Sequence, residues 1–408
     1  MLSKSAPFAS CAMAERDLAT IEGVTSFLQN TPFASHTVTR LSGGYGNYTY
    51  RIHLRKGYHE RETLVLKHAK PYLPGARDFA FPLERQIYEV GALRRVKAWL
   101  PEDSLVTVPA VHLFDEHENV IIMDDCGQGV LNLKELMLTD PPPLEVAETI
   151  GTALGEFIGK LHSRCTGKEE GVGGGGGHSE MVDFVNGNQV ARSISALVTY
   201  GRLVPTLTGQ EAGGLEYKPD PPLDVSPEEM TVVEEIAKVK SEQVMTSMET
   251  VVMGDFWPGN IMLSFNEGGR DEIERTEKTI RRIYVLDWEL VKPGVAGLDV
   301  GQFIAEMHLL RCFSQSCYKS ASTVIDSALK SYRGVRGGGD GGVARAVLIH
   351  VGAHLVAWTP RVPTWEGAEK VREVVLSGVR NLVDGYRGSE EGIKGSIVGE
   401  LLGDPKDS

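Results

Sequence analysis

The sequence predicts an α+β fold with a small, strand-rich first part and a larger, mainly helical second part. Residues 36–69 and 108–125 contain short runs of Val, Leu, Ile, Thr and Tyr with turn residues between them, which is typical of strands. Residues 141–164 and most of 301–382 instead space their apolar residues at helical intervals. The first part therefore favours a sheet, and the second a set of core helices.

The elements of the first part follow in order along the chain. Residues 36–69 predict a β-hairpin with a third strand, because HTVTRLSGG enters a glycine turn, YTYRIHL leaves it and ETLVLKHA continues. Residues 83–99 change to helical spacing, and the residues expected on one face are Leu83, Ile87, Leu93 and Val96. VPAVHLFD and NVIIMDD then predict two more strands, ending at Asp125.

A change of character after Cys126 and Gly127 places the expected domain boundary there, giving domains 1–125 and 126–408. The second domain begins with a long helix over 141–164. Its expected buried stripe is Val146, Ile150, Leu154, Phe157 or Ile158, and Leu161.

Residues 250–291 return to strands. TVVM, IMLSF and RRIYVLDWELV are the expected strands, and a charged hairpin excursion precedes the last of them. Two glycine tracts, 167–178 and 333–342, are interpreted as flexible linkers because neither lies between a clear strand and a helix start. His162 ends a core helix, where a packing or capping role is expected. His308 and His354 lie in apolar helical contexts, which is typical of buried structural histidines.

Composition excludes several classes of protein. The 408 residues are 41% hydrophobic and 24% charged, as in an ordinary globular protein. A net charge of −13, from 55 acidic and 42 basic residues, disfavours nucleic acid and anionic membranes as partners and mildly favours cationic small molecules. No apolar run approaches the roughly 18–20 residues of a membrane span.

Five scattered cysteines, without a CxxC pair, indicate reduced thiols in an intracellular compartment; they are Cys11, Cys126, Cys165, Cys312 and Cys317. The N-terminus lacks a continuous apolar core and soon carries the charged residues Glu15, Arg16 and Asp17, which argues against a secretory signal. A cytoplasmic location is therefore expected.

The strongest chemical pattern is Asp255-Phe-Trp-Pro-Gly-Asn260, followed by Asp287 at the end of the strand IYVLD. Transfer of a phosphoryl group requires a carboxylate that orients the attacking hydroxyl and accepts its proton, together with oxygen ligands for magnesium. An Asp at one strand end, an amide five residues on and a second Asp at a neighbouring strand end supply these groups. The alternative is that Asp255 and Asn260 only cap a turn.

Two further patterns point to phosphate binding. The glycine turn in Leu41-Ser-Gly-Gly-Tyr-Gly-Asn-Tyr-Thr-Tyr50 allows backbone N–H groups to approach phosphate oxygens, although an ordinary hairpin turn would look the same. Lys67, in LVLKHA, needs a partner if its strand is buried, and the following helix offers Glu84 and Glu89. The alternative is a surface lysine on an exposed strand face.

In this order the motifs resemble those of the aminoglycoside phosphotransferase and choline kinase-like family, relatives of the protein kinases, over roughly residues 35–310. The family's His-Gly-Asp-x-x-x-x-Asn loop corresponds to Met253-Gly254-Asp255-Phe-Trp-Pro-Gly-Asn260, and its metal motif to Leu286-Asp287-Trp288-Glu289. The resemblance implies a bilobal protein-kinase-like fold, with domain 1–125 as the nucleotide-binding lobe and 126–408 as the catalytic and acceptor-binding lobe.

The resemblance also implies roles for individual residues. Asp255 corresponds to the catalytic base, and Asn260 and Asp287 correspond to the magnesium ligands. Glu89 is preferred to Glu84 as the residue that positions Lys67, because Glu89-Val-Gly-Ala-Leu93 matches the family's helix pattern. Asp299, in Gly297-Leu-Asp-Val-Gly-Gln-Phe303, corresponds to a residue that braces the catalytic loop. The implied nucleotide-binding residues are Gly43, Gly44, Gly46, Asn47, Lys67, Glu89 and the hinge Met123, Asp124 and Asp125, whose backbone would contact adenine.

The expected activity is therefore transfer of the ATP γ-phosphate, with Mg²⁺, to a hydroxyl of a cationic or sugar-like small molecule. The acceptor is expected between Asp255 and the helices after residue 300. Met253 stands where the family has His, which leaves a catalytically weak nucleotide-binding scaffold or sensor as the alternative. A protein kinase is disfavoured because the chain has no Asp-Phe-Gly or Ala-Pro-Glu motif.

Overall fold

The computed structural model describes residues 17–42, 44, 46–166, 179–210, 217–266 and 279–403. The chain forms two compact units, the first comprising Met1–Leu83 with Val111–Asp125 and the second Glu84–Ala110 with Cys126–Ser408. The expected boundary after Asp125 is one of the boundaries between these units. Residues 84–110 differ from the expected division, because they pack with the second unit although they precede the boundary.

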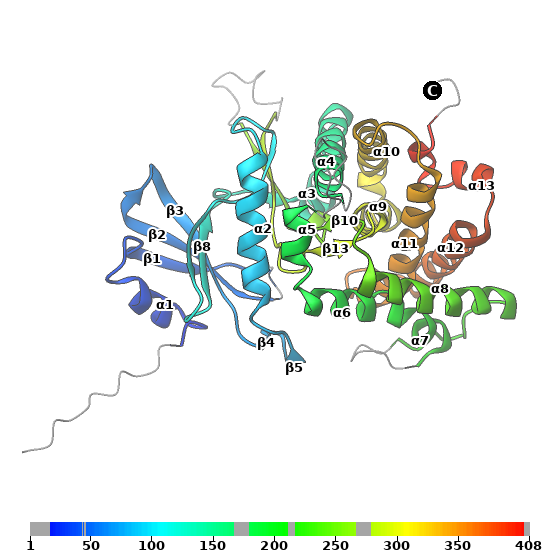
Figure 1. Cartoon of the computed structure of the whole chain (residues 1–408), viewed down its shortest axis with the longest axis horizontal. Helices are drawn as coiled ribbons and strands as arrows, with labels where there is room; N and C mark the ends of the chain where they lie inside the picture. The colour runs from blue at the N-terminus through cyan, green and yellow to red at the C-terminus, as the bar shows by residue number, and fades with distance from the viewer. Residues whose placement is uncertain are drawn as a thin grey trace, which may run out of the picture. The chain divides into compact units, whose positions relative to one another are not determined.

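The first unit is built on a five-stranded antiparallel sheet with strand order β1-β2-β3-β8-β7 (Figure 1). The predicted hairpin, third strand and two later strands are therefore confirmed. Their bounds are β1 (Ser35–Arg40), β2 (Tyr48–Tyr58), β3 (Arg61–His68), β7 (Val111–Asp115) and β8 (Val120–Asp124). A short hairpin of β4 (Tyr72–Leu73) and β5 (Ala76–Ala80) completes the strands of this unit.

Strict alternation in β2 creates the core of the first unit. Tyr48, Tyr50, Ile52 and Leu54 are buried, while the residues between them are half-buried, as expected for a strand with one face on the core. The helix α1 (Ile21–Leu28), which was not predicted, covers this face with Val24 and Leu28, and it begins at an N-cap hydrogen bond to the Thr20 side chain.

The predicted helix over 83–99 is present as α2 (Arg85–Trp99), and Leu93 and Val96 of its predicted face are buried, but Ile87 is not. Ile87 is 42% exposed, whereas Glu89 is 1% exposed and Arg85 is fully buried. A search for apolar stripes misses this face because charged groups can be buried when they are paired, and Arg85 has such a partner in Glu289.

The second unit contains two small sheets. The larger has the order β6-β12-β11-β9, with β11 (Ile261–Phe265) and β12 (Ile280–Val285) as an antiparallel pair between β6 (Val106–Thr107) and β9 (Leu131–Asn132). The smaller sheet pairs β10 (Thr250–Val252) with β13 (Lys292–Gly294). The expected charged hairpin loop falls largely at 267–278, outside the described residues.

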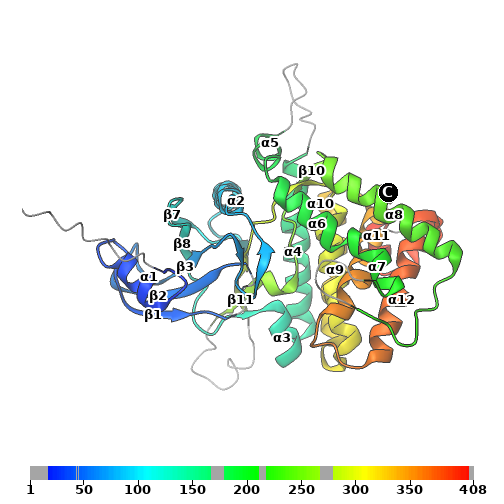
Figure 2. The ribbon, with the colours of Figure 1, turned by 90° about the horizontal axis from the view of Figure 1, so that it is seen from below.

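Helices make up the rest of the second unit, which confirms the predicted α+β class. In Figures 1 and 2, α4 packs beside α10, and α11 lies between α9 and α12. The helices are α3 (Leu133–Thr139), α4 (Leu144–Arg164), α5 (Glu180–Val185), α6 (Gln189–Val198), α7 (Leu203–Thr208), α8 (Pro227–Thr246), α9 (Gly297–Phe313), α10 (Tyr318–Val335), α11 (Gly341–Trp358), α12 (Ala368–Arg387) and α13 (Glu390–Lys394).

The second glycine tract has a defined place in the fold. Gly337 and Gly338, at positive φ, turn the chain out of α10, and the Asp340 side chain then accepts hydrogen bonds from Gly342 and Val343 at the start of α11. The tract is therefore a helix connection. The first tract, 167–178, lies outside the described residues.

Among the described residues, one segment, Gly341–Arg361, has the length and mean hydropathy (1.3) of a membrane span, but 67% of it is buried within the protein. It is accounted for as the core helix α11, which packs between α9 and α12. Of the five cysteines, the four that the structure describes are free thiols, as predicted for those four.

The α4–α10 contact depends on the absence of a side chain at Gly155, because a Cβ there would overlap the Ala328 carbonyl oxygen. We predict that Gly155→Ala lowers the free energy of unfolding by about 1–3 kcal/mol through overpacking. Gly334→Ala, on the open side of α10, should raise it by about 0.5–1 kcal/mol because alanine favours the helix. Urea denaturation of both variants measures the effect, and equal midpoints would contradict this view of the contact.

Candidate active site

The loop that follows β10 contains the Asp255 motif, and its first turn requires glycine. Gly254 has φ of 84°, a left-handed conformation, and a Cβ at this position would overlap Leu290 O and Lys292 Nζ. The chain can therefore turn here and direct Asp255 away from the strand only with glycine at position 254.

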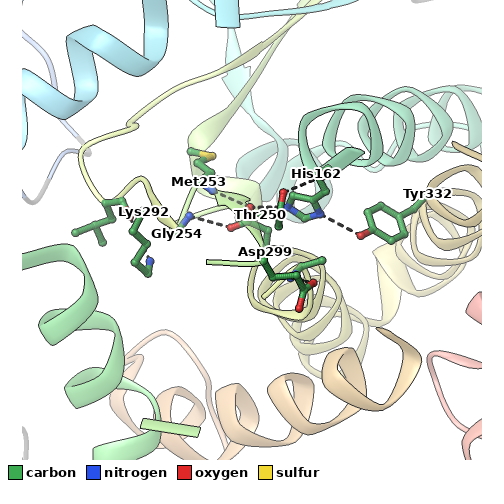
Figure 3. A network of polar contacts seen from close by, with 10 residues as sticks. His162, Thr250, Met253, Gly254, Lys292, Asp299 and Tyr332 are labelled. Carbon is green, nitrogen blue, oxygen red and sulfur yellow. Dashed lines mark hydrogen bonds and ion pairs between the residues drawn. The ribbon is translucent and has the colours of Figure 1, made fainter. Parts of the chain in front are cut away.

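Asp299 holds this turn from the first turn of α9. Its Oδ2 accepts a hydrogen bond from Met253 N at 2.7 Å, and its Oδ1 accepts one from Gly254 N at 2.8 Å (Figure 3). Asp299 is completely buried, so both hydrogen bonds are shielded from water. The predicted bracing role of Asp299 is confirmed.

Asp299 is itself held by His162 at the end of α4. His162 Nε2 lies 3.2 Å from Asp299 Oδ2, and Nδ1 lies 3.1 Å from Tyr332 OH on α10 (Figure 3). The His162 carbonyl also accepts a hydrogen bond from Thr250 Oγ1 at 2.8 Å. His162 is a buried structural histidine, as expected, and it ties three helices to β10.

Met253 fits this arrangement as a packing residue. Its side chain is completely buried, and the polar anchor of the loop is its main-chain N–H, which any residue other than proline supplies. Replacing the family's histidine with methionine therefore leaves the hydrogen bonds to Asp299 intact.

The Asp255 carboxylate is fixed by two amide side chains. Gln302 Nε2 on α9 donates to Oδ1 at 2.8 Å, and Asn260 Nδ2 donates to Oδ2 at 2.9 Å. Burial, followed by the nearby Asp287 carboxylate, raises the pKa of Asp255 to about 6, although the two hydrogen bonds act in the opposite direction. The result is an oriented carboxylate in a strongly acidic neighbourhood.

Asn260 and Asp287 meet because of the β11–β12 register. Ile261 pairs with Val285, and Leu286 N donates to Asn260 O at 2.9 Å, so both residues lie at the same end of the hairpin. Asp287 has a left-handed φ of 66°, an uncommon conformation for a residue other than glycine. It is followed by Trp288, which is completely buried and donates from Nε1 to Val285 O.

Three carboxylates cluster beside this hairpin end. Oxygen atoms of Glu89, Asp287 and Glu289 all lie within 4.8 Å of one another. Glu289 is paired with the buried Arg85 at 2.9 Å, and Asn188 Nδ2 holds the Glu289 carbonyl at 3.1 Å. Carboxylate and amide oxygens are the donors that a divalent cation such as Mg²⁺ prefers, so this donor set fits one.

Lys292 is a buried cation that the sequence analysis did not single out. It is 1% exposed, its ammonium lies against Gly254, and it donates to Leu290 O at 3.2 Å. Burial lowers the pKa of Lys292 to about 8, although the charges of Asp299 and Asp255 oppose this shift. A basic group therefore lies directly behind the Asp255 loop.

In the first unit, the predicted phosphate-binding turn joins β1 to β2. Leu41 N donates to Thr49 O at 2.9 Å and closes the turn, and Asn47 is buried within it. A Cβ on Gly44 would make only ordinary contacts, the nearest 3.6 Å from Thr49 Oγ1. The fold therefore does not require glycine at position 44, and Gly43 lies outside the described residues.

The other predicted nucleotide-binding residues of this unit lie on its central strands. Lys67 on β3 is half-buried and stands in register between Thr49 on β2 and Ile121 on β8. The same register places Met123 and Asp124 at the end of β8, beside Val65 and Leu64.

The two acidic side chains of the predicted hinge form ion pairs within the first unit. Asp125 accepts two hydrogen bonds from Arg51, at 2.6 and 2.9 Å. Asp124 is paired with Arg61 at 2.6 Å and with His112 at 2.8 Å. Both carboxylates therefore already have partners within the first unit.

The structure thus brings together Asp255, Asn260, Asp287 and Glu89 in the second unit. Glu84, the alternative to Glu89, is exposed at the start of α2. Sequence patterns did not identify Gln302, Glu289 and Lys292 as neighbours of the site. Gln302 lies within the Gly297–Phe303 motif, so its sequence context could have identified it, whereas nothing in the sequence marks Lys292.

Comparison with known proteins identifies the class. A model of the "Phosphotransferase enzyme family" matches residues 37–311. A 4-hydroxytryptamine kinase from Psilocybe cyanescens is 33% identical over 394 residues, covering 95% of this chain and 98% of the relative. The enzyme of the same name from Psilocybe cubensis is 31% identical over 397 residues, with the same coverage.

A solved structure of an amicoumacin kinase is 10% identical, covers 88% of this chain and 92% of its own, and has a TM-score of 0.45. The family match and the relatives are decisive, and the chain belongs to the phosphotransferase enzyme family. It is a small-molecule kinase, as the sequence motifs predicted.

We predict that Lys292→Met increases stability but impairs catalysis. Removing the buried ammonium should raise the free energy of unfolding by about 1–3 kcal/mol. Turnover should fall at least tenfold, because the positive charge next to Asp255 and Asp299 is lost. Denaturation and initial-rate measurements test both effects, with Lys240→Met on α8 as the control. Unchanged turnover would show that Lys292 acts only in packing.

Proposed function

We propose that this protein transfers the γ-phosphate of ATP, with Mg²⁺, to the hydroxyl of a small aromatic amine of the hydroxytryptamine type. The relatives named for 4-hydroxytryptamine phosphorylation support the acceptor, because each aligns with 95% of this chain. The observation that carries the chemistry is the Asp255 carboxylate, held by Gln302 and Asn260 next to Asp287.

Asp255 is the proposed catalytic base. As the acceptor hydroxyl oxygen attacks the terminal phosphorus of ATP, its proton passes to Asp255, and the bond between that phosphorus and the ADP oxygen breaks. The two amide hydrogen bonds keep the carboxylate in one orientation. The brace from Asp299 fixes the main chain that carries it.

Asn260 and Asp287 are the proposed ligands of Mg²⁺. Asn260 uses its Nδ2 toward Asp255, which leaves Oδ1 as the atom for a cation. Bound there, Mg²⁺ would offset the negative charge of the phosphates. Glu89 and Glu289 would add negative charge around the cation.

In the first unit, Gly43, Gly44, Gly46, Asn47 and Lys67 are the proposed phosphate-binding residues. By resemblance, Glu89 positions Lys67, and the backbone of Met123, Asp124 and Asp125 binds adenine. The ion pairs of the Asp124 and Asp125 side chains support a backbone role, because those carboxylates already have partners.

An inactive nucleotide-binding scaffold is the alternative, and Met253 was the reason to consider it. The loop geometry favours catalysis, because the main-chain brace does not depend on the side chain at position 253. We also propose a cytoplasmic location, which the free thiols of the four described cysteines support.

The test is Mg²⁺-dependent ADP release by the purified protein with 4-hydroxytryptamine, in parallel with amino alcohols, aminoglycosides, sugars and methylthioribose. Stimulation by the hydroxylated amine is the expected result. Asp255→Asn should reduce this turnover by about 10³-fold or more, with ATP affinity within threefold of the original.

Retained turnover in Asp255→Asn would remove Asp255 as the base. If another acceptor class stimulated turnover instead, the proposed acceptor would be wrong, while the assignment as a kinase would stand. If ATP bound but no acceptor stimulated turnover, the scaffold alternative would be favoured.

We predict that Gly44→Ala weakens ATP binding without weakening the fold. A Cβ at position 44 meets no close protein neighbour, so the melting temperature should be unchanged. A phosphate lying against this turn would clash with the new methyl group, and the KM for ATP should rise about tenfold. Unchanged KM for ATP would remove the glycine turn from the phosphate site.

A further inference from the structure

Six side chains of the second unit form a closed series of neighbours, here called the residue ring, that begins and ends at the Asp255 loop. They are Gln302, Glu306, Phe313, Trp365, Lys134 and Trp257. The helix α9 supplies three of its members on one face, because Gln302, Glu306 and Phe313 are spaced by four and seven positions. Gln302 donates to Asp255, and at the other end of α9 Phe313 stacks on Trp365 with ring centroids 4.9 Å apart.

Lys134 closes the ring from α3. Its ammonium lies over the Trp365 ring at 4.9 Å and over the Trp257 ring at 5.4 Å. Trp257 is the second residue after Asp255, and its ring lies against Gly259, where a Cβ would overlap it. Pairing of Asn132 with Met262 on β11 fixes the start of α3 and thereby the position of Lys134.

The contacts of Lys134 define a site for a cation. Within the described residues its ammonium donates no hydrogen bond, and its closest recorded partners are the two indole faces. Two tryptophan rings arranged around one ammonium form an aromatic cage, which attracts organic cations. The cage lies beside the catalytic loop, because Trp257 belongs to that loop.

Glu306 provides the negative charge of the ring. It is 7% exposed, and its Oε1 accepts a hydrogen bond from His354 Nε2 at 2.7 Å, while Oε2 makes no hydrogen bond within the described residues. Burial raises the pKa of Glu306, but the hydrogen bond and charge of His354 and the charge of Lys134 outweigh it and hold the pKa below its usual value. The carboxylate therefore stays ionised.

Trp365 provides an independent indication of a ligand. Its side chain is 8% exposed, and its buried Nε1–H has no hydrogen-bond partner in the described part of the chain. A buried donor without a partner costs free energy, which a ligand oxygen or π face at this position would recover.

We propose that this ring is the acceptor site and that Glu306 selects acceptors that carry an ammonium group. This inference rests on the proposed function and adds the residues that read the acceptor. The aromatic ring of the acceptor lies between Trp257 and Trp365, its ammonium pairs with Glu306, and its hydroxyl faces Asp255. Without an acceptor, the Lys134 ammonium occupies the cage, and it moves out when the acceptor binds.

The spacing of the ring limits the size of the acceptor. Gln302 contacts Asp255 directly. Glu306 follows Gln302 by one helical turn, which is about 6 Å along α9. A hydroxyl and an ammonium separated by roughly that distance on one aromatic scaffold fit both carboxylates. Two indole rings, of Trp257 and Trp365, and the Glu306 carboxylate fit a polyhydroxylated sugar poorly, since sugars require several hydrogen-bonding groups.

The first experiment compares 4-hydroxytryptamine with 4-hydroxyindole, which keeps the ring and hydroxyl but has no amine. Glu306→Gln should lower kcat/KM for the amine about 100-fold and for the neutral compound less than threefold. Glu369→Gln, an exposed carboxylate on α12, is the control and should change neither value. Equal losses for both acceptors, or no loss, would overturn the role of Glu306.

The second experiment tests Lys134 and the cage. Lys134→Met removes the competing ammonium, so the KM for the amine should fall about threefold or more at a similar kcat. A tenfold loss of kcat at constant KM would instead place Lys134 on the transferred phosphate and overturn its role in the cage. Trp365→Phe, which removes the N–H, should raise the KM for the amine severalfold, and Trp365→Leu should raise it further. Unchanged values in both Trp365 variants would overturn the cage.

Binding of tryptamine, which has no hydroxyl to phosphorylate, separates this inference from the proposed function. Calorimetry should detect tryptamine binding to the original protein and about 100-fold weaker binding to Glu306→Gln. If this result were obtained without turnover of any acceptor, the residue ring would be supported as a binding site and the proposed function would be wrong. If Glu306→Gln phosphorylated 4-hydroxytryptamine as well as the original protein, the proposed function would be supported and the residue ring would be wrong as the acceptor site.

Discussion

The geometry of the Asp255 loop depends on the Asp299 carboxylate. It accepts hydrogen bonds from Met253 N and Gly254 N, at 2.7 and 2.8 Å, in an environment closed to water. Charge-assisted hydrogen bonds of this kind are strong and directional, so the turn before Asp255 has one conformation. His162 and Tyr332 hold Asp299 in turn, and the loop is thereby tied to the packing of α4, α9 and α10.

Several of the buried charges of the second unit lie around the Asp255 loop. Arg85 neutralises Glu289 beside Asp287, Lys292 lies behind Gly254, and His354 holds Glu306 on α9. Burying these groups costs free energy that an apolar core would not. Their concentration around one loop is what a site that handles phosphate charge requires, because low-dielectric surroundings strengthen each electrostatic interaction.

The sequence predicted much of the fold because its strands and long helices carry clear periodicity. The sheet strands β1, β2, β3, β7 and β8 and the helix α4 appear where they were expected. On α2 the prediction was wrong for Ile87, which the pattern of apolar residues placed inside. Periodicity measures hydrophobicity alone, and it cannot recognise a helix face that buries Arg85 through an ion pair with Glu289.

The sequence by itself determined the chemistry of this protein, because Asp255, Asn260 and Asp287 stand at fixed distances along strands whose ends must meet. The tertiary structure decided which groups lie around them. Lys292, Glu306 and Trp365 lie far from Asp255 along the chain, and no local spacing distinguishes them from ordinary core or surface residues. Their roles depend on which helix faces which loop, and that is set by the packing of the whole second unit rather than by any single segment.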